Sequence, residues 1–445
     1  MADLSAIVKA YDIRGVVGEG IDEPVVRALG AALARLVGAE SRAVVVGHDM
    51  RPSSPALARA FAEGVTGQGL DVVDIGLAST DQLYFASGSL DLPGAMFTAS
   101  HNPARYNGIK LCRAGAVPIG QGTGLEAIRA DVEAGVPEGP GGGTVSTRDV
   151  LTDYAAHLHG LVAWPARPLR VVVDAGNGMA GHTVPAVLAH LDVVPLYFEL
   201  DGTFPNHEAN PLDPANLVDL QKAVLAEGAD LGLAFDGDAD RCFVVDERGE
   251  AVSPSAVTAL VAVRALAQHP GATIIHNCIT SRAVPELVAE HGGTPVRTRV
   301  GHSFIKARMA ETGAVFGGEH SAHYYFRDFW RADSGMLAAL HVLAALGEAD
   351  RPLSELMSGY ERYAASGEVN STVTDVPGRV AAVRAAYAHA EFDELDGLTA
   401  SLPDGSWFNL RPSNTEPLLR LNVEAADAAA VAALRDDVLA IVRAQ

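Results

Sequence analysis

Three stretches of this chain repeat one pattern, in which two short β-branched runs flank a helical segment and a third apolar run follows. The runs are AVVVGHD, DVVDIG and GAMF, then RVVVDAG, DVVPLY and LGLAF, then TIIHNC, TPVRTR and GAVF. The first two runs of each stretch are separated by roughly 20 to 30 residues, which is long enough for a helical crossover between parallel strands. The repeat predicts three related α/β units.

A polar loop directly follows the last run of each unit. TASHNP begins at Thr98, DGDADR at Asp236 and GGEHSAH at Gly317. Three polar loops therefore share one topological position in three units. We expect the chemistry of the protein to reside in these loops.

The boundaries between units follow from local composition. The stretch GVPEGPGGGT before Val145 is rich in Gly and Pro and predicts a linker, while Ser253-Pro254 is typical of a helix start. The third unit is expected to end around a helix in LSELMSGYERYAAS, and a smaller piece without the repeat follows, with strands near SWFNLRP and LLRLNVEA. The predicted domains are 1–144, 145–250, 251–366 and 367–445.

Charge and hydropathy exclude several classes of partner. The formal net charge is −22 with 48% hydrophobic residues, so neither nucleic acid nor an anionic membrane surface is an expected partner. The N-terminal stretch lacks the features of a signal peptide, and no apolar run reaches the ~20 residues that span a bilayer. We expect a soluble, cytoplasmic protein whose three cysteines are buried free thiols.

Three carboxylates alternate along DGDADR, which follows an apolar run. Asp236, Asp238 and Asp240 can converge on one hard cation, and Mg²⁺ is favoured. An EF-hand also begins this way, with Glu247 at its twelfth position, but it requires Gly where this chain has Arg241. An acidic turn with a surface salt bridge to that arginine is the remaining alternative.

Other polar segments offer a nucleophile and anion-binding groups. TASHNP and YNGIK contribute Ser100, His101 and Lys110, in which a base or a positive charge could activate the hydroxyl, although a plain Ser/Asn turn has a similar composition. RPSNTEP, from Arg411 to Pro417, could form a phosphate cradle or an ordinary turn. In GGEHSAH, Glu319 and Ser321 could bind sugar hydroxyls. His320 and His323 in that loop fit either a site or simple packing.

The five segments YDIRG, TASHNP, DGDADR, GEHSAH and RPSNTEP occur in this order, and together they resemble the α-D-phosphohexomutase family, in particular bacterial members that act on mannose and glucose phosphates. The resemblance implies an α/β fold of four domains around a central cleft. Three would be related mixed α/β sheet units, and the fourth a C-terminal α+β domain similar to the TATA-binding protein. It also implies reversible phosphoryl transfer between C1 and C6 of a hexose phosphate through a phosphoserine, with Mg²⁺ as cofactor and a hexose 1,6-bisphosphate as intermediate and activator.

The resemblance assigns roles to particular residues. Ser100 would carry the phosphoryl group, and one of its phosphate oxygens would complete the Mg²⁺ sphere of the three aspartates. Arg14 and Arg241 would stabilise the transferring charge, and Lys110 and His302 would act as general acid and base. The residues implied to line the cleft or bind substrate are Tyr11, His101, Glu319, Ser321, His323, Arg411, Ser413, Asn414 and Thr415.

Two positions depart from the family pattern. Ile279, with Arg282 nearby, occupies the place of a ligand-contacting lysine in some relatives, and His320 stands where Met or Gln is common. The loop therefore leaves the choice of sugar open. A phosphoglucosamine mutase or a glucose-only phosphoglucomutase stays an alternative within the family, and a metal-dependent sugar phosphatase or a non-catalytic sugar-phosphate binder stays an alternative outside it. The sequence makes no prediction of oligomeric state.

Overall fold

The structure is a computed structural model that describes residues 4–9, 11–412 and 418–444. It contains two compact units. The first comprises residues 1–252 and 321–356, and the second comprises residues 253–320 and 357–445.

The first sheet of the first unit is built around parallel strands. Its order is β1-β5-β4-β2-β3-β7, with β6 paired to β5. Strand β2 is parallel to β3 and β4, whereas β5 is antiparallel to β4 and β1. The strands are β1 (Ile13–Val16), β2 (Ala43–His48), β3 (Asp71–Leu77), β4 (Gly94–Phe97), β5 (Tyr106–Arg113), β6 (Val117–Pro118) and β7 (Val145–Thr147).

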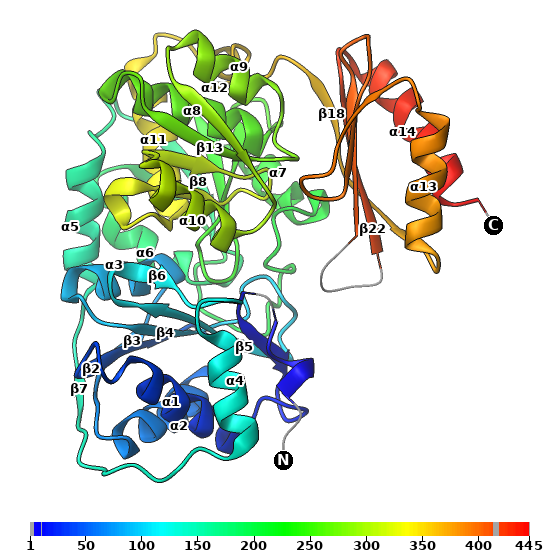
Figure 1. Cartoon of the computed structure of the whole chain (residues 1–445). Helices are drawn as coiled ribbons and strands as arrows, with labels where there is room; N and C mark the ends of the chain where they lie inside the picture. The colour runs from blue at the N-terminus through cyan, green and yellow to red at the C-terminus, as the bar shows by residue number, and fades with distance from the viewer. Residues whose placement is uncertain (1–3, 10, 413–417, 445) are drawn as a thin grey trace. The chain divides into compact units, whose positions relative to one another are not determined.

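Helices cover both faces of this sheet, with α1 and α2 on one face and α3 on the other (Figure 1). Asp22 caps α1 by accepting a hydrogen bond from the Val25 amide. Helices α1 and α2 cross closely, because a Cβ on Gly30 would lie 2.2 Å from the Phe61 carbonyl oxygen and one on Gly64 would lie 2.0 Å from that of Arg27. The helices are η1 (Leu4–Ala6), α1 (Glu23–Val37), α2 (Ser54–Gly67), α3 (Thr80–Leu90), η2 (Ala114–Ala116) and α4 (Leu125–Ala134).

The second sheet of the first unit has the order β12-β11-β10-β8-β9. Strand β8 is parallel to β9 and β10, and β11 is antiparallel to β10 and β12. The strands are β8 (Arg170–Asp174), β9 (Asp192–Leu196), β10 (Leu231–Phe235), β11 (Cys242–Asp246) and β12 (Ala251–Val252). The helices of this part are α5 (Leu151–Leu161), α6 (Ala180–Val187), η3 (Pro214–Leu217) and α7 (Val218–Glu227).

The second segment of the first unit adds a short antiparallel pair of strands and a long buried helix. Its elements are β16 (Tyr324–Phe326), η4 (Arg327–Phe329), β17 (Ala332–Asp333) and α11 (Gly335–Glu348). Gly335, at the start of α11, lies against the backbone of Arg241, and a Cβ there would be 2.6 Å from the Arg241 carbonyl carbon. This close approach fixes α11 against the end of the acidic loop, which is the segment DGDADR of residues 236–241.

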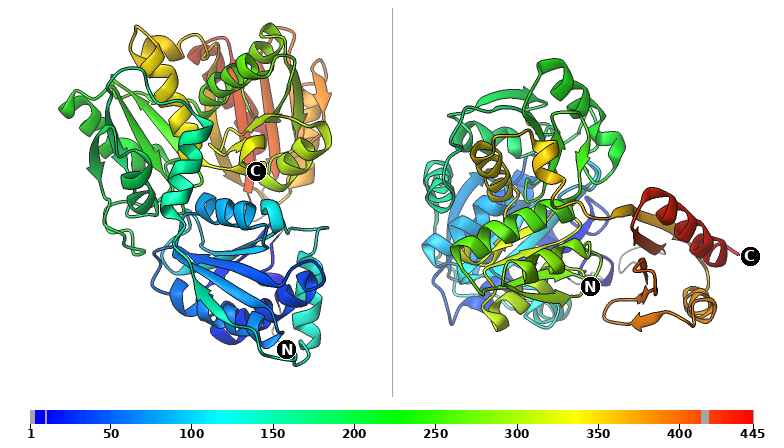
Figure 2. Two further views of the ribbon diagram at one scale, coloured as in Figure 1. Left: turned by 90° about the vertical axis from the view of Figure 1, so that its left-hand side faces the viewer. Right: turned by 90° about the horizontal axis from the view of Figure 1, so that it is seen from above.

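The second unit contains a parallel three-stranded arrangement, β14-β13-β15, and a C-terminal antiparallel sheet, β18-β22-β21-β20-β19. Helices α13 and α14 lie on one face of the C-terminal sheet (Figures 1 and 2). The strands are β13 (Thr273–Asn277), β14 (Thr294–Thr298), β15 (Phe316–Gly318), β18 (Ala364–Thr372), β19 (Glu391–Asp393), β20 (Leu398–Ser401), β21 (Trp407–Pro412) and β22 (Leu418–Ala425). The helices are α8 (Pro254–Gln268), α9 (Ala283–Glu290), α10 (His302–Thr312), α13 (Val376–Ala386) and α14 (Ala428–Val442), and α12 (Leu353–Met357) spans the junction of the two units.

The structure confirms the predicted repeat. The orders β3-β2-β4, β9-β8-β10 and β14-β13-β15 each place the first strand of the stretch between the second and the third, and all these pairs are parallel. The third strand of the third stretch was predicted at 313–316, but it runs over Phe316–Gly318, so the polar loop begins later.

One predicted helix is mostly wrong. LSELMSGYERYAAS is helical only over Leu353–Met357, and β18 begins at Ala364, which pairs with Ala425 of β22. Pairing with the C-terminal sheet therefore overrides the helix propensity of the Ala-containing end of this segment. In the part of the chain that the structure describes, no helix combines the length and the apolar composition needed to span a membrane.

Candidate active site

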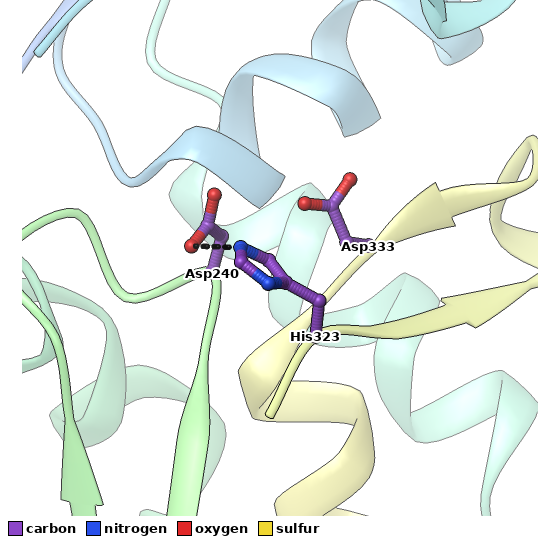
Figure 3. Close-up of side chains that lie close together, drawn as sticks. All are labelled: Asp240, His323 and Asp333. Atoms are coloured by element: carbon purple, nitrogen blue, oxygen red, sulfur yellow. Dashed lines mark ion pairs between the residues drawn. The ribbon is translucent and has the colours of Figure 1, made fainter. Parts of the chain in front are cut away.

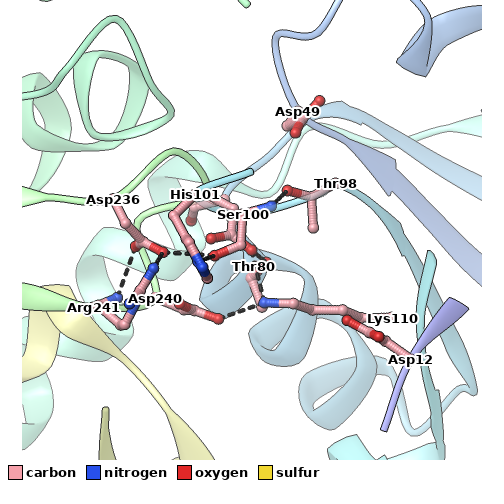
Figure 4. A network of polar contacts seen from close by, with 12 residues as sticks. Asp12, Asp49, Thr80, Thr98, Ser100, His101, Lys110, Asp236, Asp240 and Arg241 are labelled. Carbon is pink, nitrogen blue, oxygen red and sulfur yellow. Dashed lines mark hydrogen bonds and ion pairs between the residues drawn. The ribbon is translucent and has the colours of Figure 1, made fainter. Parts of the chain in front are cut away.

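The loop after β4 brings Ser100 to the carboxylates of the loop after β10 (Figure 4). Ser100 is 5% exposed, and its Oγ donates a hydrogen bond of 2.8 Å to Asp236 Oδ2 and lies 3.2 Å from His101 Nδ1. Its φ is +51°, in a region that non-glycine residues rarely occupy. Such backbone conformations gather at functional sites, where the surroundings hold them in place.

A buried arginine holds this loop in shape. The two Nη atoms of Arg51, a fully buried residue, donate to four backbone carbonyl oxygens at 2.7 to 3.0 Å. These carbonyls belong to Ser100, Asn102, Pro103 and Tyr106. Asp49 accepts from Arg51 Nε at 3.2 Å, and the ring of Phe204 lies 5.1 Å from the guanidinium carbon. The charge of Arg51 is thereby paired while its donors fix the carbonyl groups around Ser100.

The serine loop, which is the loop of residues 98–105 between β4 and β5, touches the acidic loop through its backbone. A Cβ on Gly237 would lie 2.4 Å from the Ser100 carbonyl oxygen, so only glycine allows this approach. Thr80, the first residue of α3, donates its amide to the Asp238 carbonyl at 3.0 Å and its hydroxyl to Asp238 Oδ2 at 2.6 Å. Residues that follow strands of the first sheet therefore position the acidic loop of the second sheet, which is the candidate metal-binding loop.

The three carboxylates of DGDADR form a buried cluster. Asp236, Asp238 and Asp240 are each 0% exposed, and one oxygen of each lies within 4.8 Å of the others. Asp238 Oδ1 and Asp240 Oδ1 have no hydrogen-bond donor among the described residues. Buried carboxylate oxygens without donors fit a hard cation, which prefers oxygen ligands. The cluster could therefore hold a metal ion, in agreement with the sequence prediction.

Two cationic side chains already neutralise part of this cluster. Lys110 Nζ lies 2.7 Å from Asp238 Oδ2 and 2.6 Å from Asp240 Oδ2, and Arg241 Nε donates to Asp236 Oδ2 at 2.9 Å. Burial raises the pKa of Asp236 to about 7 despite Arg241. Burial would also raise the pKa of Asp238, but Lys110 holds it well below its usual value.

Arg14 lies beside the serine loop, which also contains His101. Arg14 of β1 donates from Nη1 to Asn102 Oδ1 at 2.5 Å and from Nη2 to Asp12. The pKa of His101 is lowered well below its ordinary value by burial and by the charges of Arg241 and Arg14, which makes His101 neutral. Tyr11 is half-buried and directly precedes Asp12 in the sequence.

His323 joins the same group from the segment before β16 (Figure 3). Its Nε2 lies 3.6 Å from Asp240 Oδ1, and its Nδ1 lies 3.0 Å from Ser321 Oγ. An isolated antiparallel bridge also pairs its backbone with that of Arg241. The structure therefore brings Ser321 and His323 to the acidic loop. The sequence alone had left open whether His323 belongs to a site or only packs in the interior.

Other predicted residues lie in the second unit. Glu319 is 2% exposed, and its Oε1 accepts from Asn277 Nδ2 at 3.1 Å and from the Gly301 amide at 3.0 Å. His302 begins α10 directly after that amide. His320, in contrast, is half-buried, and its Nδ1 lies 3.1 Å from Ser255 Oγ.

The C-terminal candidates are only partly described. Arg411, at the end of β21, is 5% exposed, and its Nη2 lies 3.6 Å from Glu368 Oε2. Ser413, Asn414 and Thr415 lie outside the described residues. Ile279, which the resemblance places where some relatives have a ligand-contacting lysine, is 7% exposed. Arg282 instead donates to the Gly405 carbonyl and lies over the ring of Tyr363.

Sequence reasoning missed three supporting residues, namely Arg51, Thr80 and Asp81. Asp81 is buried and accepts hydroxyl hydrogen bonds from Ser79, from Tyr154 at 2.7 Å and from Ser334 at 2.6 Å. Arg51 follows the buried strand β2, and Thr80 and Asp81 follow the partly buried strand β3, at the edge of the sheet that carries Ser100. These residues could have been found from the sequence as polar residues that follow neighbouring parallel strands. The carboxyl ends of such strands meet at one edge of a sheet, where sites form.

Family models of phosphoglucomutase/phosphomannomutase match four successive parts of the chain. The alpha/beta/alpha domain I matches residues 5–136, domain II residues 152–249, domain III residues 253–363 and the C-terminal domain residues 368–441.

Individual relatives match over nearly the whole chain. A protein named phosphohexose mutases from Xanthomonas campestris pv. campestris is 43% identical over 427 residues, covering 94% of each chain. A phosphomannomutase from Salmonella typhimurium is 42% identical over 435 residues, again covering 94% of each. The crystal structure of a phosphoglucomutase/phosphomannomutase family protein from Burkholderia thailandensis has a TM-score of 0.90 and 35% identity, and covers 100% of this chain and 98% of that one.

Proposed function

Because the chain belongs to the phosphoglucomutase/phosphomannomutase family, we propose that it interconverts hexose 1-phosphates and hexose 6-phosphates. The relative named phosphomannomutase supports mannose phosphates as substrates, and the family description supports glucose phosphates as well. A glucosamine phosphate is the substrate alternative within the same reaction. The reaction is an isomerisation that proceeds through a hexose 1,6-bisphosphate.

One observation carries this proposal. The hydroxyl of Ser100 lies 2.8 Å from a carboxylate oxygen of a buried three-aspartate cluster. A serine that only served structure would need no such cluster, whereas a phosphoserine would bring its oxygens to a cation held there. Mg²⁺ bound by Asp236, Asp238 and Asp240 would neutralise charge on the transferring phosphoryl group.

Cationic side chains complete the proposed transfer site. Arg241 and Arg14 would stabilise the negative charge of the phosphoryl group, as charge-assisted donors do. We assign Lys110 and His302 to proton transfer with the attacking and leaving sugar hydroxyls. Two carboxylates hold the proton of Lys110, with a pKa well above its usual value even though burial opposes this. The amine would release that proton more readily when a dication shares those carboxylates.

The remaining candidates would bind the parts of the sugar that do not react. Glu319 and Ser321 would bind ring hydroxyls, with Tyr11, His101 and His323 lining the same site. The non-transferred phosphate would be bound by Arg411, Ser413, Asn414 and Thr415. A single phosphoserine serves both ends of the sugar only if the bisphosphate turns around, so this phosphate site must accept either phosphate.

We further propose the domain boundaries given by composition. The four ranges are 1–144, 145–250, 251–366 and 367–445, with the last similar in fold to the TATA-binding protein.

A hexose phosphate is charged and does not cross a bilayer unaided, which supports a cytoplasmic site of action.

The test is a coupled assay that follows mannose 6-phosphate formed from mannose 1-phosphate, with and without a hexose 1,6-bisphosphate. Ser100→Ala should abolish turnover and the phosphorylated species in an intact-mass measurement. Ser146→Ala is the matched control, because Ser146 is exposed on edge strand β7 of the same sheet. Turnover by Ser100→Ala at the wild-type rate refutes the phosphoserine, and release of inorganic phosphate in place of an isomer indicates a phosphatase.

A further inference from the structure

The loop of residues 201–210, between β9 and η3, lies against two supports of the candidate active site. Near one end of this loop, a Cβ on Gly202 would lie 2.6 Å from the Cα of Arg51, the residue that holds the serine loop. Near the other end, a Cβ on Gly237 of the acidic loop would lie 3.5 Å from the Cβ of Ala209. The 201–210 loop therefore links the residue behind the serine loop to the acidic loop.

The backbone of the 201–210 loop is held in an uncommon conformation. Phe204 has a φ of +52°, which non-glycine residues rarely adopt, and its ring lies 5.1 Å from the guanidinium carbon of Arg51. Such a conformation costs free energy and persists only where the surroundings hold it in place. The loop therefore needs an anchor between its two points of contact.

His207 lies between these two points and makes two polar contacts. Its side chain is 12% exposed, its Nε2 lies 3.0 Å from Asp174 Oδ2, and its Nδ1 lies 2.9 Å from the Glu208 carbonyl oxygen. A carbonyl and a carboxylate oxygen both accept hydrogen bonds, so each calls for an N–H group. A neutral imidazole has one N–H, whereas an imidazolium has two. The geometry therefore fits a positively charged His207 paired with Asp174.

Asp174 connects this ion pair to the acidic loop. It is the last residue of β8, is 1% exposed, and accepts at Oδ1 from the Gly176 amide at 2.8 Å. The turn that follows reaches the acidic loop at Met179, whose amide donates to the Gly237 carbonyl at 2.9 Å. The ion pair therefore joins His207 to the same turn that holds the backbone of the acidic loop.

The charges around His207 favour its protonated form. The hydrogen bond to Asp174 raises the pKa of His207, burial opposes this, and Asp219 of α7 adds to the increase. The ring of Tyr197 lies edge-on at 5.4 Å from the imidazole, and its hydroxyl donates to Asp219 Oδ2 at 2.9 Å. The ion pair is therefore present at low and neutral pH and is lost as the pH rises through the pKa of His207.

We propose that His207 is a positioning residue for phosphoryl transfer, which holds the 201–210 loop against Arg51 and against the acidic loop at the same time. Ser100 follows a strand of the first sheet, and the acidic loop follows a strand of the second. The distance between the nucleophile and the cation site therefore depends on supports that reach both sheets. His207 acts through this loop, and the inference rests on the proposed function of Ser100.

The first experiment compares His207→Gln with the wild type by steady-state kinetics and hydrogen exchange of the full chain. We expect kcat to fall by about 10- to 100-fold, the effect of losing one charged hydrogen bond, with little change in KM for mannose 1-phosphate. Amides of residues 98–105 and 236–241 should exchange faster, because both loops lose a support. His159→Gln is the matched control, since His159 is half-buried in the same unit and its Nε2 lies 2.8 Å from the Val187 carbonyl oxygen.

Asp174→Asn separates the position of His207 from its charge. The new side chain can still accept from the Gly176 amide, and its NH₂ group can donate to Nε2 of a neutral imidazole whose Nδ1 donates to the Glu208 carbonyl. We expect wild-type exchange in both loops and a kcat near that of the wild type, together with a lower titration midpoint for His207 in ¹⁵N NMR. In the wild type this midpoint should lie above the ordinary value of about 6.5.

Several outcomes would overturn the inference. It is wrong if His207→Gln leaves kcat and the exchange of both loops unchanged, or if faster exchange is confined to residues 201–210. It is also wrong if His207 titrates below about 6.5 in the wild type. Should His207→Gln fail to fold, Asp174→Asn carries the test: one histidine midpoint should fall with exchange unchanged, and no falling midpoint overturns the ion pair.

The same measurements distinguish this inference from the proposed function. Hydrogen exchange and titration need no turnover, so they test His207 whether or not the wild type isomerises a hexose phosphate. A wild type without mutase activity, in which His207→Gln still loosens both loops, refutes the proposed function and supports the positioning role. An active wild type with an unchanged His207→Gln variant refutes the positioning role alone.

Discussion

Replacing Arg51 by lysine should impair catalysis with little effect on substrate affinity. The guanidinium donates to four carbonyl oxygens and to Asp49 from three nitrogens held in one plane. An ammonium group has one nitrogen and three donors, so at least two of these five contacts are lost. Each lost charged hydrogen bond costs about 1.5–3 kcal/mol, so the native conformation of the serine loop loses about 3–6 kcal/mol of stabilisation.

The consequence concerns the position of Ser100. The positive φ of Ser100 costs about 1–2 kcal/mol by itself. The hydrogen bonds lost in Arg51→Lys stabilise the loop by more than this cost. Without them the loop should relax toward an ordinary backbone conformation. A misplacement of about 1 Å at a reacting oxygen costs on the order of 100-fold in rate. We expect kcat to fall by about that factor while KM changes little, because none of the proposed sugar- and phosphate-binding groups is replaced.

Steady-state kinetics and hydrogen exchange together test this argument. Amides of residues 98–108 should exchange faster in Arg51→Lys than in the wild type, and phosphorylation of Ser100 by a hexose 1,6-bisphosphate should be slower in intact-mass measurements. Arg105→Lys is the control, because Arg105 is an exposed arginine of the same loop. An unchanged kcat with unchanged exchange in Arg51→Lys refutes the role given to Arg51.

Three further predictions address the metal, the phosphate site and pH. Asp238→Asn should raise the Mg²⁺ concentration needed for half-maximal activity, since a hard anionic ligand becomes a neutral amide; full wild-type activity in EDTA contradicts this. Arg411→Ala should slow the forward and the reverse reaction alike, by about 1.5–3 kcal/mol in kcat/KM, and a defect in one direction alone rules out a shared phosphate site. Burial raises the pKa of Asp81 to about 6, above its unfolded value, so its contribution to stability is lost as pH rises through about 6. The melting temperature of Asp81→Asn relative to the wild type should therefore rise between about pH 5 and pH 7, and a constant difference across that range contradicts the shifted pKa.

Local pattern was sufficient to predict the repeated units. Parallel strands buried on both faces give continuous β-branched runs such as VVV at 44–46 and 171–173, and these runs are readable without knowledge of any partner. The helix start at Ser253-Pro254 was also predicted, and Ser253 Oγ accepts from the Ser255 amide. Both features depend on residues close together in the sequence.

The parts that were missed depend on distant partners. Nothing near Ala364 reveals that it pairs with Ala425, so its segment was predicted helical although it forms a strand. Arg51 acts on carbonyl groups about fifty residues away, and Thr80 bonds Asp238 across two sheets. Arg51 and Thr80 can be read in the sequence as polar residues, but their partners depend on how the strand ends come together in the fold.

The close contact at Gly237 makes the serine loop and the acidic loop depend on each other, although they follow strands of two different sheets. The two loops fit together only because the residue at 237 has no side chain to meet the Ser100 carbonyl. A change as small as an added methyl group at 237 would push the serine loop away. A substitution in either loop is therefore tolerated only where it leaves the backbone of the other loop in place.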